Sequence, residues 1–405
     1  MRICDLTNFY HGKSGGVKTY LHQKMAYLAR FRSDEHLVIV PGPANAEEKY
    51  GRSTICRVRA PELPGSGAYR LIFNTGRVNA LIREFRPEIV ELGCPYFLPW
   101  ALAARRRYGF RLTAFYHSDF PHALARSAAR LAGKIPGALL EKSAAAYVRA
   151  MYRRTDLTLA PSLDAAARLS SLGIPGVQVI PLGVDLEHFH PRHRRLRLRL
   201  RLGLSSQQVL LLYVGRFTRE KGLDVLRRAF ESLTARNPGR YHLLLIGEGP
   251  LGDELRNWAA NRGDVTVGGY LQGKQLAEVY ASADIFVTAG WAETFGLTIL
   301  EAQASGLPVA AVTSGAARQT VAPEAGFLVE ANDPLSFAAA VARLAGRDFR
   351  TLGCLARQYV EVNFGWEKTF CQLFSLYEKL LTNRLRTRPE TPAASGATGR
   401  RIARA

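Results

Sequence analysis

The sequence is poor in cysteine and has no long apolar run. Its five cysteines, at positions 4, 56, 94, 354 and 371, form neither a C-x-x-C pair nor a His/Cys cluster at zinc spacing. These spacings argue against a disulfide scaffold and against a structural zinc site. We therefore expect reduced, mostly buried thiols in a cytoplasmic protein. The N-terminus MRICDLTNFY also lacks the apolar core of a signal peptide.

Acidic residues are scarce as well, with 34 Asp and Glu against 55 Lys and Arg and a net charge of +21. A field of this size attracts phosphates, nucleic acid and anionic lipid. Eleven of the charges lie in two segments, an arginine-rich stretch at 192–201 and the tail from 384 to 405. This pattern fits either a solvated helix face with a disordered tail or a surface for an anionic partner. No apolar stretch approaches the roughly 18 to 20 residues that cross a bilayer, so any membrane contact should be peripheral.

What the sequence does contain is short β-type apolar runs that alternate with helical patterns, and 405 residues are enough for two domains. Such alternation predicts the α/β class, with parallel sheets wound by helices in two Rossmann-like domains. The expected strands lie at 2–7, 36–41, 88–92, 111–116, 156–160 and 177–180, and then at 209–215, 241–247, 264–269, 284–290, 307–312 and 326–330.

The expected division of the chain follows the breaks in this alternation. An N-terminal domain spans 1–183, a linker 184–202, a C-terminal domain 203–364, an amphipathic helix 365–382 and a basic disordered tail 383–405. Within the linker, the Arg/Leu alternation from 194 to 202 fits either a strand or a short basic helix that ends at Gly203.

Open α/β sheets bind ligands at the carboxyl ends of their strands, so the strand-to-helix loops are the places to search. Gly15 and Gly16 open a helix after the first strand, where backbone N–H groups can approach a phosphate. Arg216 and Lys221 follow the strand VLLLYVG, and two cations at this spacing suit a diphosphate.

Two carboxylates stand out in GWAETFGLTILEAQASGLPVA, residues 290–310. Glu301 lies inside an apolar helix that begins near Gly296, without a cation in the same segment. Burying an unpaired carboxylate is costly, and the hydroxyls of a ribose would satisfy it. Glu293 precedes the helix, near amides that point toward an anion. The alternative is an exposed Glu293 and a Glu301 that pairs with a distant arginine.

The E-x7-E pair around FGL, the downstream GLPVAA, the upstream VGRFTREKG and the Gly-Gly loop together resemble the retaining nucleotide-sugar glycosyltransferases of family 4, which have the GT-B fold. The resemblance covers roughly residues 1–382 and is nearest to lipid mannosyl- and sulfoquinovosyl-transferases. It implies two Rossmann-like domains that face each other across a cleft, with the C-terminal helix returning to the N-terminal domain. The donor lobe would be the second domain and the acceptor lobe the first.

The resemblance also implies roles for individual residues. Arg216 and Lys221 would hold the donor diphosphate and stabilise it as it leaves, Glu301 would bind the ribose, and Glu293 would bind the transferred sugar. His117, at a strand end, would lie close to the sugar C6 hydroxyl and the reaction centre. The remaining expected contacts come from Gly15 and Gly16 beside the diphosphate, Tyr270 in the turn that frames the base, and the backbone of Thr294, Phe295, Gly296 and Leu297.

The implied activity is transfer of a hexose with retention, with mannose from GDP-mannose as the favoured donor and a lipid or glycan hydroxyl as the acceptor. The alternative is a UDP-sugar of glucose, galactose, GlcNAc or sulfoquinovose. A non-catalytic anion- or nucleic-acid-binding protein is less favoured, because no aromatic-basic motif is present. No D-x-D motif is present either, so we expect neither a metal nor a cofactor. The arginines at 105–107, 149, 153 and 154 suit an anionic membrane surface.

One segment departs from the family pattern. Where relatives often carry Gly-Gly-x-x-Glu after the GLPV strand, this chain has TSGAARQT, residues 313–320. Any role of that glutamate is missing here, which bears on the choice of donor sugar.

Overall fold

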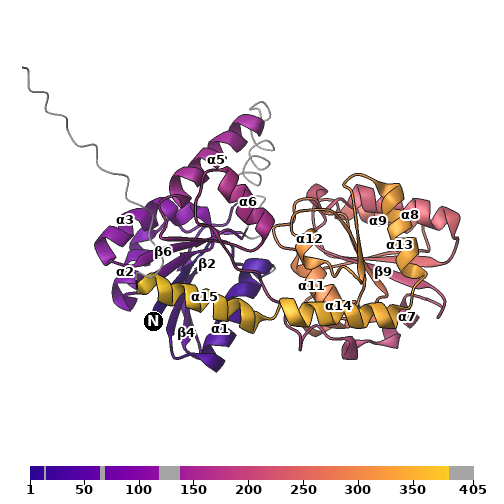
Figure 1. Cartoon of the computed structure of the whole chain (residues 1–405), viewed down its shortest axis with the longest axis horizontal. Coiled ribbons are helices and arrows are strands. Elements are labelled where there is room, and N and C mark those ends of the chain that lie inside the picture. Colours follow the sequence, from indigo (N-terminus) through magenta and orange to yellow (C-terminus); the bar gives the residue numbers. More distant parts are fainter. Residues whose placement is uncertain (13–14, 64–68, 118–136, 383–405) are drawn as a thin grey trace, which may run out of the picture.

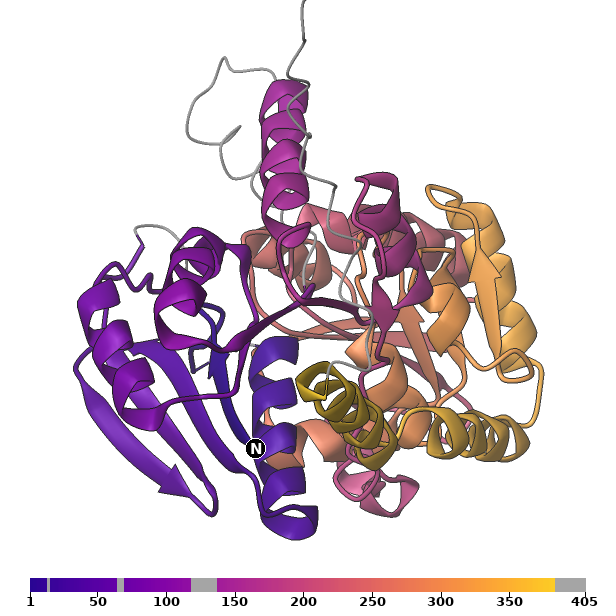
Figure 2. The ribbon, with the colours of Figure 1, turned by 60° about the vertical axis from the view of Figure 1, so that its left-hand side comes forward.

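The computed structural model describes residues 1–12, 15–63, 69–117 and 137–382 and folds them into two α/β domains (Figures 1 and 2). Each domain is a mainly parallel sheet with helices on its faces, as the sequence predicted. The segment at 118–136 and the expected tail at 383–405 lie outside the described residues.

The N-terminal sheet has the strand order β3-β4-β2-β1-β5-β6-β7-β8. All neighbours pair in parallel except β3 and β4, which form an antiparallel hairpin at the edge. The strands are β1 (Arg2–Leu6), β2 (Glu35–Gly42), β3 (Ala46–Tyr50), β4 (Ser53–Arg59), β5 (Ile89–Leu92), β6 (Arg111–Phe115), β7 (Leu157–Ala160) and β8 (Gln178–Val179). The sequence predicted six of them and missed the hairpin, because β3 is polar and exposed along its whole length.

The C-terminal sheet is parallel throughout, in the order β11-β10-β9-β12-β13-β14. All six of its strands were expected from short apolar runs. They are β9 (Val209–Val214), β10 (Tyr241–Ile246), β11 (Val265–Gly268), β12 (Ile285–Thr288), β13 (Val309–Val312) and β14 (Gly326–Val329). Helices cover both faces of such a sheet, which is why its central strands are almost fully buried.

The helices of the N-terminal domain follow the strands in alternation. They are α1 (Gly16–Phe31), α2 (Thr75–Phe85), α3 (Leu98–Tyr108), α5 (Gly137–Tyr152) and α6 (Leu163–Ser171), with the short 3-10 turn η1 (Pro95–Phe97). The linker and C-terminal domain contain η2 (Pro191–His193), α7 (Leu196–Arg201), η3 (Arg219–Lys221), α8 (Leu223–Arg236), α9 (Gly252–Ala260), α10 (Gly273–Ser282), α11 (Leu297–Ala304), α12 (Ala317–Thr320), α13 (Pro334–Ala345), α14 (Phe349–Asn363) and α15 (Trp366–Leu381).

The Arg/Leu segment is the short helix α7, not a strand, and it is followed by Gly203 at a φ of 66°. Most of its arginines take part in ion pairs within the protein. Arg199 is buried, and its Nη1 lies 2.6 Å from Asp284 Oδ2. Four of the six arginines in this stretch form ion pairs, namely Arg192 with Glu187, Arg194 and Arg199 with Asp284, and Arg195 with Glu278. The pairs with Asp284 and Glu278 fasten the linker to the C-terminal domain, whereas the pair of Arg192 with Glu187 lies within the linker.

The chain crosses between the domains twice at one place. Val184 and Gly365 form an isolated β-bridge, and the Val184 N–H donates to the Phe364 carbonyl at 2.9 Å. After this crossing, α15 lies against α1 of the N-terminal domain, whereas the preceding α14 runs along the C-terminal domain (Figure 1). The expected return of the C-terminal helix is thus confirmed.

Candidate active site

The loop between β12 and α11 contains Glu293 and leads into the helix that contains Glu301. Gly296 is the N-cap of α11 and has a φ of 83°, a left-handed conformation that favours glycine. No side chain caps this helix. The first N–H groups of α11 therefore have no capping side chain and present the positive end of the helix dipole.

Lys221 and Glu293 meet although 72 residues separate them in sequence. The loops after β9 and β12 are close together because Gly222 lies against Ala289, where an added Cβ would come within 2.2 Å of the Ala289 carbonyl oxygen. Lys221 Nζ forms an ion pair with Glu293 Oε1, and both side chains are less than one fifth exposed. The alternative interpretation, an exposed loop carboxylate at Glu293, does not hold.

Arg216 follows β9, and its side chain is 69% exposed. Its Nη2 lies 3.7 Å from Glu220 Oε1, and its carbonyl accepts a hydrogen bond from the Tyr213 hydroxyl at 3.0 Å. Burial, followed by the charge of Glu293, raises the pKa of Tyr213, while the charge of Arg216 lowers it. Tyr213 therefore lies within electrostatic reach of both predicted site residues.

Glu301 is held by a hydroxyl group and not by an arginine. The Tyr280 hydroxyl donates to Glu301 Oε2 at 2.8 Å, which leaves Oε1 without a hydrogen bond among the described residues. Burial raises the pKa of Glu301 to about 7, and the hydrogen bond from Tyr280 opposes that shift. The carboxylate is thus partly satisfied and keeps one oxygen for a ligand.

His117 comes from the other domain, at the end of β6, and its backbone meets the loop between β12 and α11. The Thr294 hydroxyl donates to the His117 carbonyl at 3.1 Å. The imidazole packs on the rings of Phe115 and Tyr20, at centroid distances of 4.2 and 4.9 Å. Burial lowers the pKa of His117 to about 3, so the ring is neutral near pH 7. Its Nε2 is buried and has no hydrogen-bond partner among the described residues.

Gly15 and Gly16 begin α1, with Gly15 as the N-cap and no side chain capping the helix. A Cβ at Gly16 would lie 3.2 Å from Leu297 Cδ1, the first residue of α11. The amino ends of α1 and α11 therefore meet across the domain boundary. Two helix amino ends facing one place form a site that suits an anion.

Two other predicted site residues, Phe295 and Tyr270, differ in how accessible their side chains are. The Phe295 side chain is in the core, in an edge contact with Phe364, so only its backbone is available to a ligand. Tyr270 is 37% exposed and follows β11, the edge strand of the sheet, two strands away from β9.

The segment that departs from the family pattern lies at the domain boundary. The backbone N–H of Leu163, in α6, donates to Gln319 Oε1 at 3.1 Å, and the Ser162 hydroxyl donates to the Thr294 carbonyl at 2.9 Å. A Cβ at Gly315 would lie 2.0 Å from Asp164 Oδ2. The sequence analysis noticed the missing glutamate here but not the domain contact that this segment makes.

The sequence analysis also missed Tyr213 and Tyr280, the residues that support the charged groups. Both lie among apolar neighbours, in VLLLYVG and LAEVYASADI, where a tyrosine resembles any other core aromatic. Only the pairing of β9 with β12, and the packing of α10 near α11, brings their hydroxyls to the site.

Among the residues that the structure describes, no three His, Cys, Asp or Glu side chains gather as a metal-binding group. Every helix in the same described ranges is too short or too polar to span a bilayer. Metal independence and a peripheral membrane role both stay predictions.

Comparison with known proteins gives matches along most of the chain. Residues 14–188 match a family model described as Glycosyltransferase Family 4, and residues 208–347 match one described as Glycosyl transferases group 1. A GDP-mannose-dependent alpha-mannosyltransferase of Mycobacterium tuberculosis is 33% identical over 80% of this chain and 82% of its own length. A second protein of that species, a GDP-mannose-dependent alpha-(1-6)-phosphatidylinositol dimannoside mannosyltransferase, is 29% identical over 93% of this chain and 95% of its own.

The fold also matches that of solved structures. The sucrose-phosphate synthase of Thermosynechococcus elongatus superimposes with a TM-score of 0.78, covering 94% of this chain and 99% of that one, at 24% identity. At this identity the match supports the arrangement of the two domains and nothing finer.

Proposed function

The chain belongs to the glycosyltransferases of family 4 and is a hexosyltransferase, and we propose that it transfers mannose from GDP-mannose, with retention, to a lipid or glycan hydroxyl. The two relatives described above are both named for GDP-mannose. The observation that carries the proposal is the ion pair of Lys221 with Glu293 near the meeting amino ends of α1 and α11, where Thr294 donates a hydrogen bond to the His117 carbonyl.

In the proposed reaction, the bond between the anomeric carbon and the diphosphate oxygen breaks while the acceptor hydroxyl approaches from the same face. The acceptor proton passes to the departing phosphate oxygen. Charge grows on the diphosphate, and Lys221 with Arg216 would stabilise it together with the helix amino ends. The exposure of Arg216 leaves it free to turn toward a ligand.

The charges of Lys221 and Glu293 neutralise one another before the donor binds. When the diphosphate arrives, Lys221 exchanges part of its contact with Glu293 for phosphate oxygens, and Glu293 gains a sugar hydroxyl as donor. A neutral His117 cannot act as a strong acid. It would instead form a hydrogen bond with a sugar hydroxyl through Nε2, the buried atom that lacks a partner among the described residues.

The proposed acceptor side is the N-terminal domain, in a cytoplasmic enzyme that touches the membrane peripherally. Five of the six predicted arginines are exposed at the ends of α3 and α5: Arg106, Arg107, Arg149, Arg153 and Arg154. Arg105 instead donates to the Arg154 carbonyl at 2.8 Å and lies 3.4 Å from Asp156. Binding to anionic vesicles that weakens with added salt would support this part of the proposal.

A thermal-shift series tests the donor. GDP-mannose at 100 times its dissociation constant should stabilise the protein by about 2.7 kcal/mol. UDP-glucose, UDP-galactose, UDP-GlcNAc and UDP-sulfoquinovose at equal concentration should give a smaller shift. A larger shift with one of the UDP-sugars would replace GDP-mannose in the proposal, and EDTA should leave turnover unchanged.

A further inference from the structure

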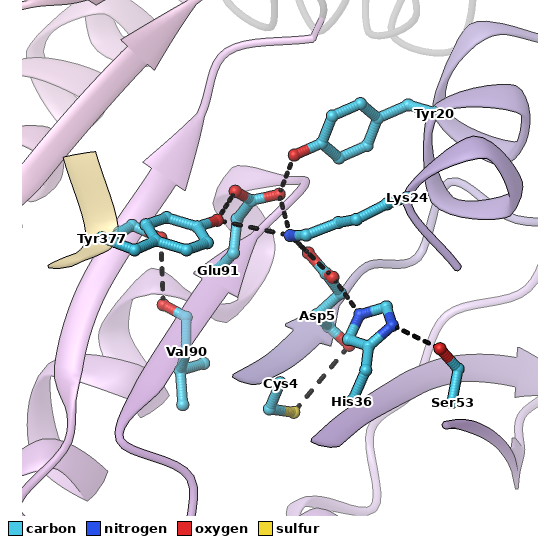
Figure 3. A network of polar contacts seen from close by, with 10 residues as sticks. Cys4, Asp5, Tyr20, Lys24, His36, Ser53, Val90, Glu91 and Tyr377 are labelled. Carbon is cyan, nitrogen blue, oxygen red and sulfur yellow. Dashed lines mark hydrogen bonds and ion pairs between the residues drawn. The ribbon is translucent and has the colours of Figure 1, made fainter. Parts of the chain in front are cut away.

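A buried polar network lies in the N-terminal domain (Figure 3), and one of its members, Tyr20, packs its ring against that of His117. It joins five elements: β1, α1, β2, β5 and α15. Its members are Asp5, Tyr20, Lys24, His36, Glu91 and Tyr377, and each is less than 4% exposed. None of them was expected from the sequence to matter for the reaction.

Lys24 is the centre of this network, and its ammonium group is fully buried. Its Nζ lies 2.9 Å from Asp5 Oδ2, 3.4 Å from Glu91 Oε1 and 3.3 Å from the Tyr377 hydroxyl. His36 Nε2 contacts Asp5 at 2.5 Å, and its other ring nitrogen contacts Ser53 Oγ at 3.0 Å. A buried cation with two carboxylates and full hydrogen bonding is rigid, because breaking any pair leaves an uncompensated charge.

Glu91 connects the two helices of the network. The Tyr20 hydroxyl, from α1, donates to Glu91 Oε1 at 2.9 Å. The Tyr377 hydroxyl, from α15, donates to the other oxygen, Oε2. The helix α15, which returns from the C-terminal domain, is therefore tied to β5 by the hydrogen bond from Tyr377 to Glu91. Tyr20 binds the same carboxylate (Figure 3).

One face of α1 leads from this network to the candidate active site. Gly16, Tyr20 and Lys24 are spaced by four residues and so share a face of the helix. Gly16 lies against Leu297, the first residue of α11, the Tyr20 ring lies 4.9 Å from the His117 ring, and Lys24 contacts the carboxylates. Of the network members, Tyr20 thus has its hydroxyl in the network and its ring against His117.

We propose that the network acts through Tyr20 to hold the His117 imidazole in its working orientation, which makes Tyr20, Glu91 and Tyr377 positioning residues for hexosyl transfer. The inference rests on the proposed role of His117. Because Tyr377 belongs to α15, the packing of this helix on the N-terminal domain would then influence the geometry around His117.

The groups that face His117 agree with this arrangement. Its pKa is lowered first by burial and then by the charge of Lys24 on α1, while Asp5 on β1 raises it. Tyr20 and Phe115 cover the ring, and Thr294, in the loop between β12 and α11, donates a hydrogen bond to the backbone carbonyl of His117. A change in the network therefore alters both the packing and the field at the imidazole.

The test compares three variants that each remove one hydroxyl: Tyr20→Phe, Tyr377→Phe and, as the control, Tyr27→Phe. Tyr27 lies outside the network, between the same two helices, with its ring 5.7 Å from that of Phe374. Two readouts are needed. The first is donor kinetics, as kcat and KM, and the second is the NMR signals of the His117 imidazole in histidine-labelled protein. We expect Tyr20→Phe and Tyr377→Phe to lower kcat about tenfold, to leave the donor KM within about twofold and to shift the His117 signals. Tyr27→Phe should change none of these.

Unchanged His117 signals in both network variants would overturn the proposal, whatever happens to kcat, and so would shifted signals with wild-type kcat. If a tyrosine variant folds poorly, Glu91→Gln, which keeps the shape of the side chain, takes its place with the same expected outcome. The NMR readout needs no donor, so it still reports on the network if GDP-mannose is the wrong substrate. Normal turnover by His117→Ala would instead contradict the proposed role of His117 itself.

Discussion

Lys221 is the residue on which the proposed chemistry depends most directly. Its Nζ contacts Glu293 at the domain boundary, in a position where it can meet a diphosphate. Removing a preorganised group that stabilises developing charge costs roughly 10² to 10³ in kcat. We therefore expect Lys221→Ala to lose that much activity in a GDP-release assay while its unfolding midpoint stays close to that of the wild type.

The control for this substitution is Lys379→Ala, which changes an exposed lysine on α15. It should retain wild-type turnover. If Lys221→Ala also turns over normally, the leaving diphosphate must be stabilised elsewhere.

Glu301 should make the affinity for GDP-mannose depend on pH. Burial raises its pKa to about 7, so the carboxylate gains charge as the pH rises from 6 to 8. Ribose hydroxyls donate to the charged form, so affinity for GDP-mannose should increase about tenfold over this range. The sugar diphosphate itself does not titrate there.

Equilibrium binding at several pH values measures this effect, with Glu301→Gln as the matched variant. That variant should bind more weakly at pH 8 and show a flat profile. If the affinity of the wild type for GDP-mannose does not change with pH, Glu301 does not bind the donor in the way proposed.

At the scale of single elements, one carboxylate binds two arginines of the linker. Asp284 precedes β12 and accepts hydrogen bonds from Arg199 at 2.6 Å, from Arg194 at 3.1 Å and from the Leu210 N–H at 2.8 Å. Asp284→Ala would leave Arg199 buried and unpaired, which typically costs about 3 to 5 kcal/mol. We expect urea unfolding of the C-terminal domain to show a loss of that size.

Asp253→Ala is the comparison for this measurement, because Asp253 is 90% exposed and pairs with Arg256 on one helix turn. It should cost less than about 0.5 kcal/mol. Equal effects in the two variants would mean that the Asp284 cluster is not a structural anchor.

The elements themselves were largely predictable from the sequence, and the site only partly. Among the residues that the structure describes, twelve of the fourteen strands follow from short apolar runs, and the turn at Gly296 follows from a glycine before an apolar helix. The ion pair between Lys221 and Glu293 does not follow, because it requires the loops after β9 and β12 to be adjacent. The Lys24 network is equally non-local, although a lysine on the apolar face of α1 was a signal that could have been noticed.

At the scale of the whole molecule, several polar contacts between described residues dock the two domains, among them Thr294 with His117 and Ser162 with Thr294. Besides the crossing at Val184, α6 meets the 313–320 segment through Leu163, Asp164 and Gly315. A methyl group at Gly315 would overlap the Asp164 side chain, with distances of 2.0 Å to Oδ2 and 2.7 Å to Cβ. Gly315→Ala should therefore loosen the docking, raise the radius of gyration in solution scattering and lower kcat.

Gly263→Ala is the matched control, because an added Cβ there meets nothing within 4 Å. Removing the opposing side chain in the double variant Gly315→Ala/Asp164→Gly should restore the scattering profile. A wild-type profile for Gly315→Ala alone would show that this contact does not hold the domains together.

The most direct test of the central claim is the stereochemistry of GDP-mannose cleavage, followed by proton NMR in the absence of acceptor, when water takes the acceptor's place. We expect GDP to be released and the first mannose to appear to be the α-anomer, before it equilibrates. Lys221→Ala should slow this release about 10² to 10³-fold. Initial appearance of the β-anomer, or no cleavage of GDP-mannose by protein that cleaves a UDP-sugar, would contradict the central claim.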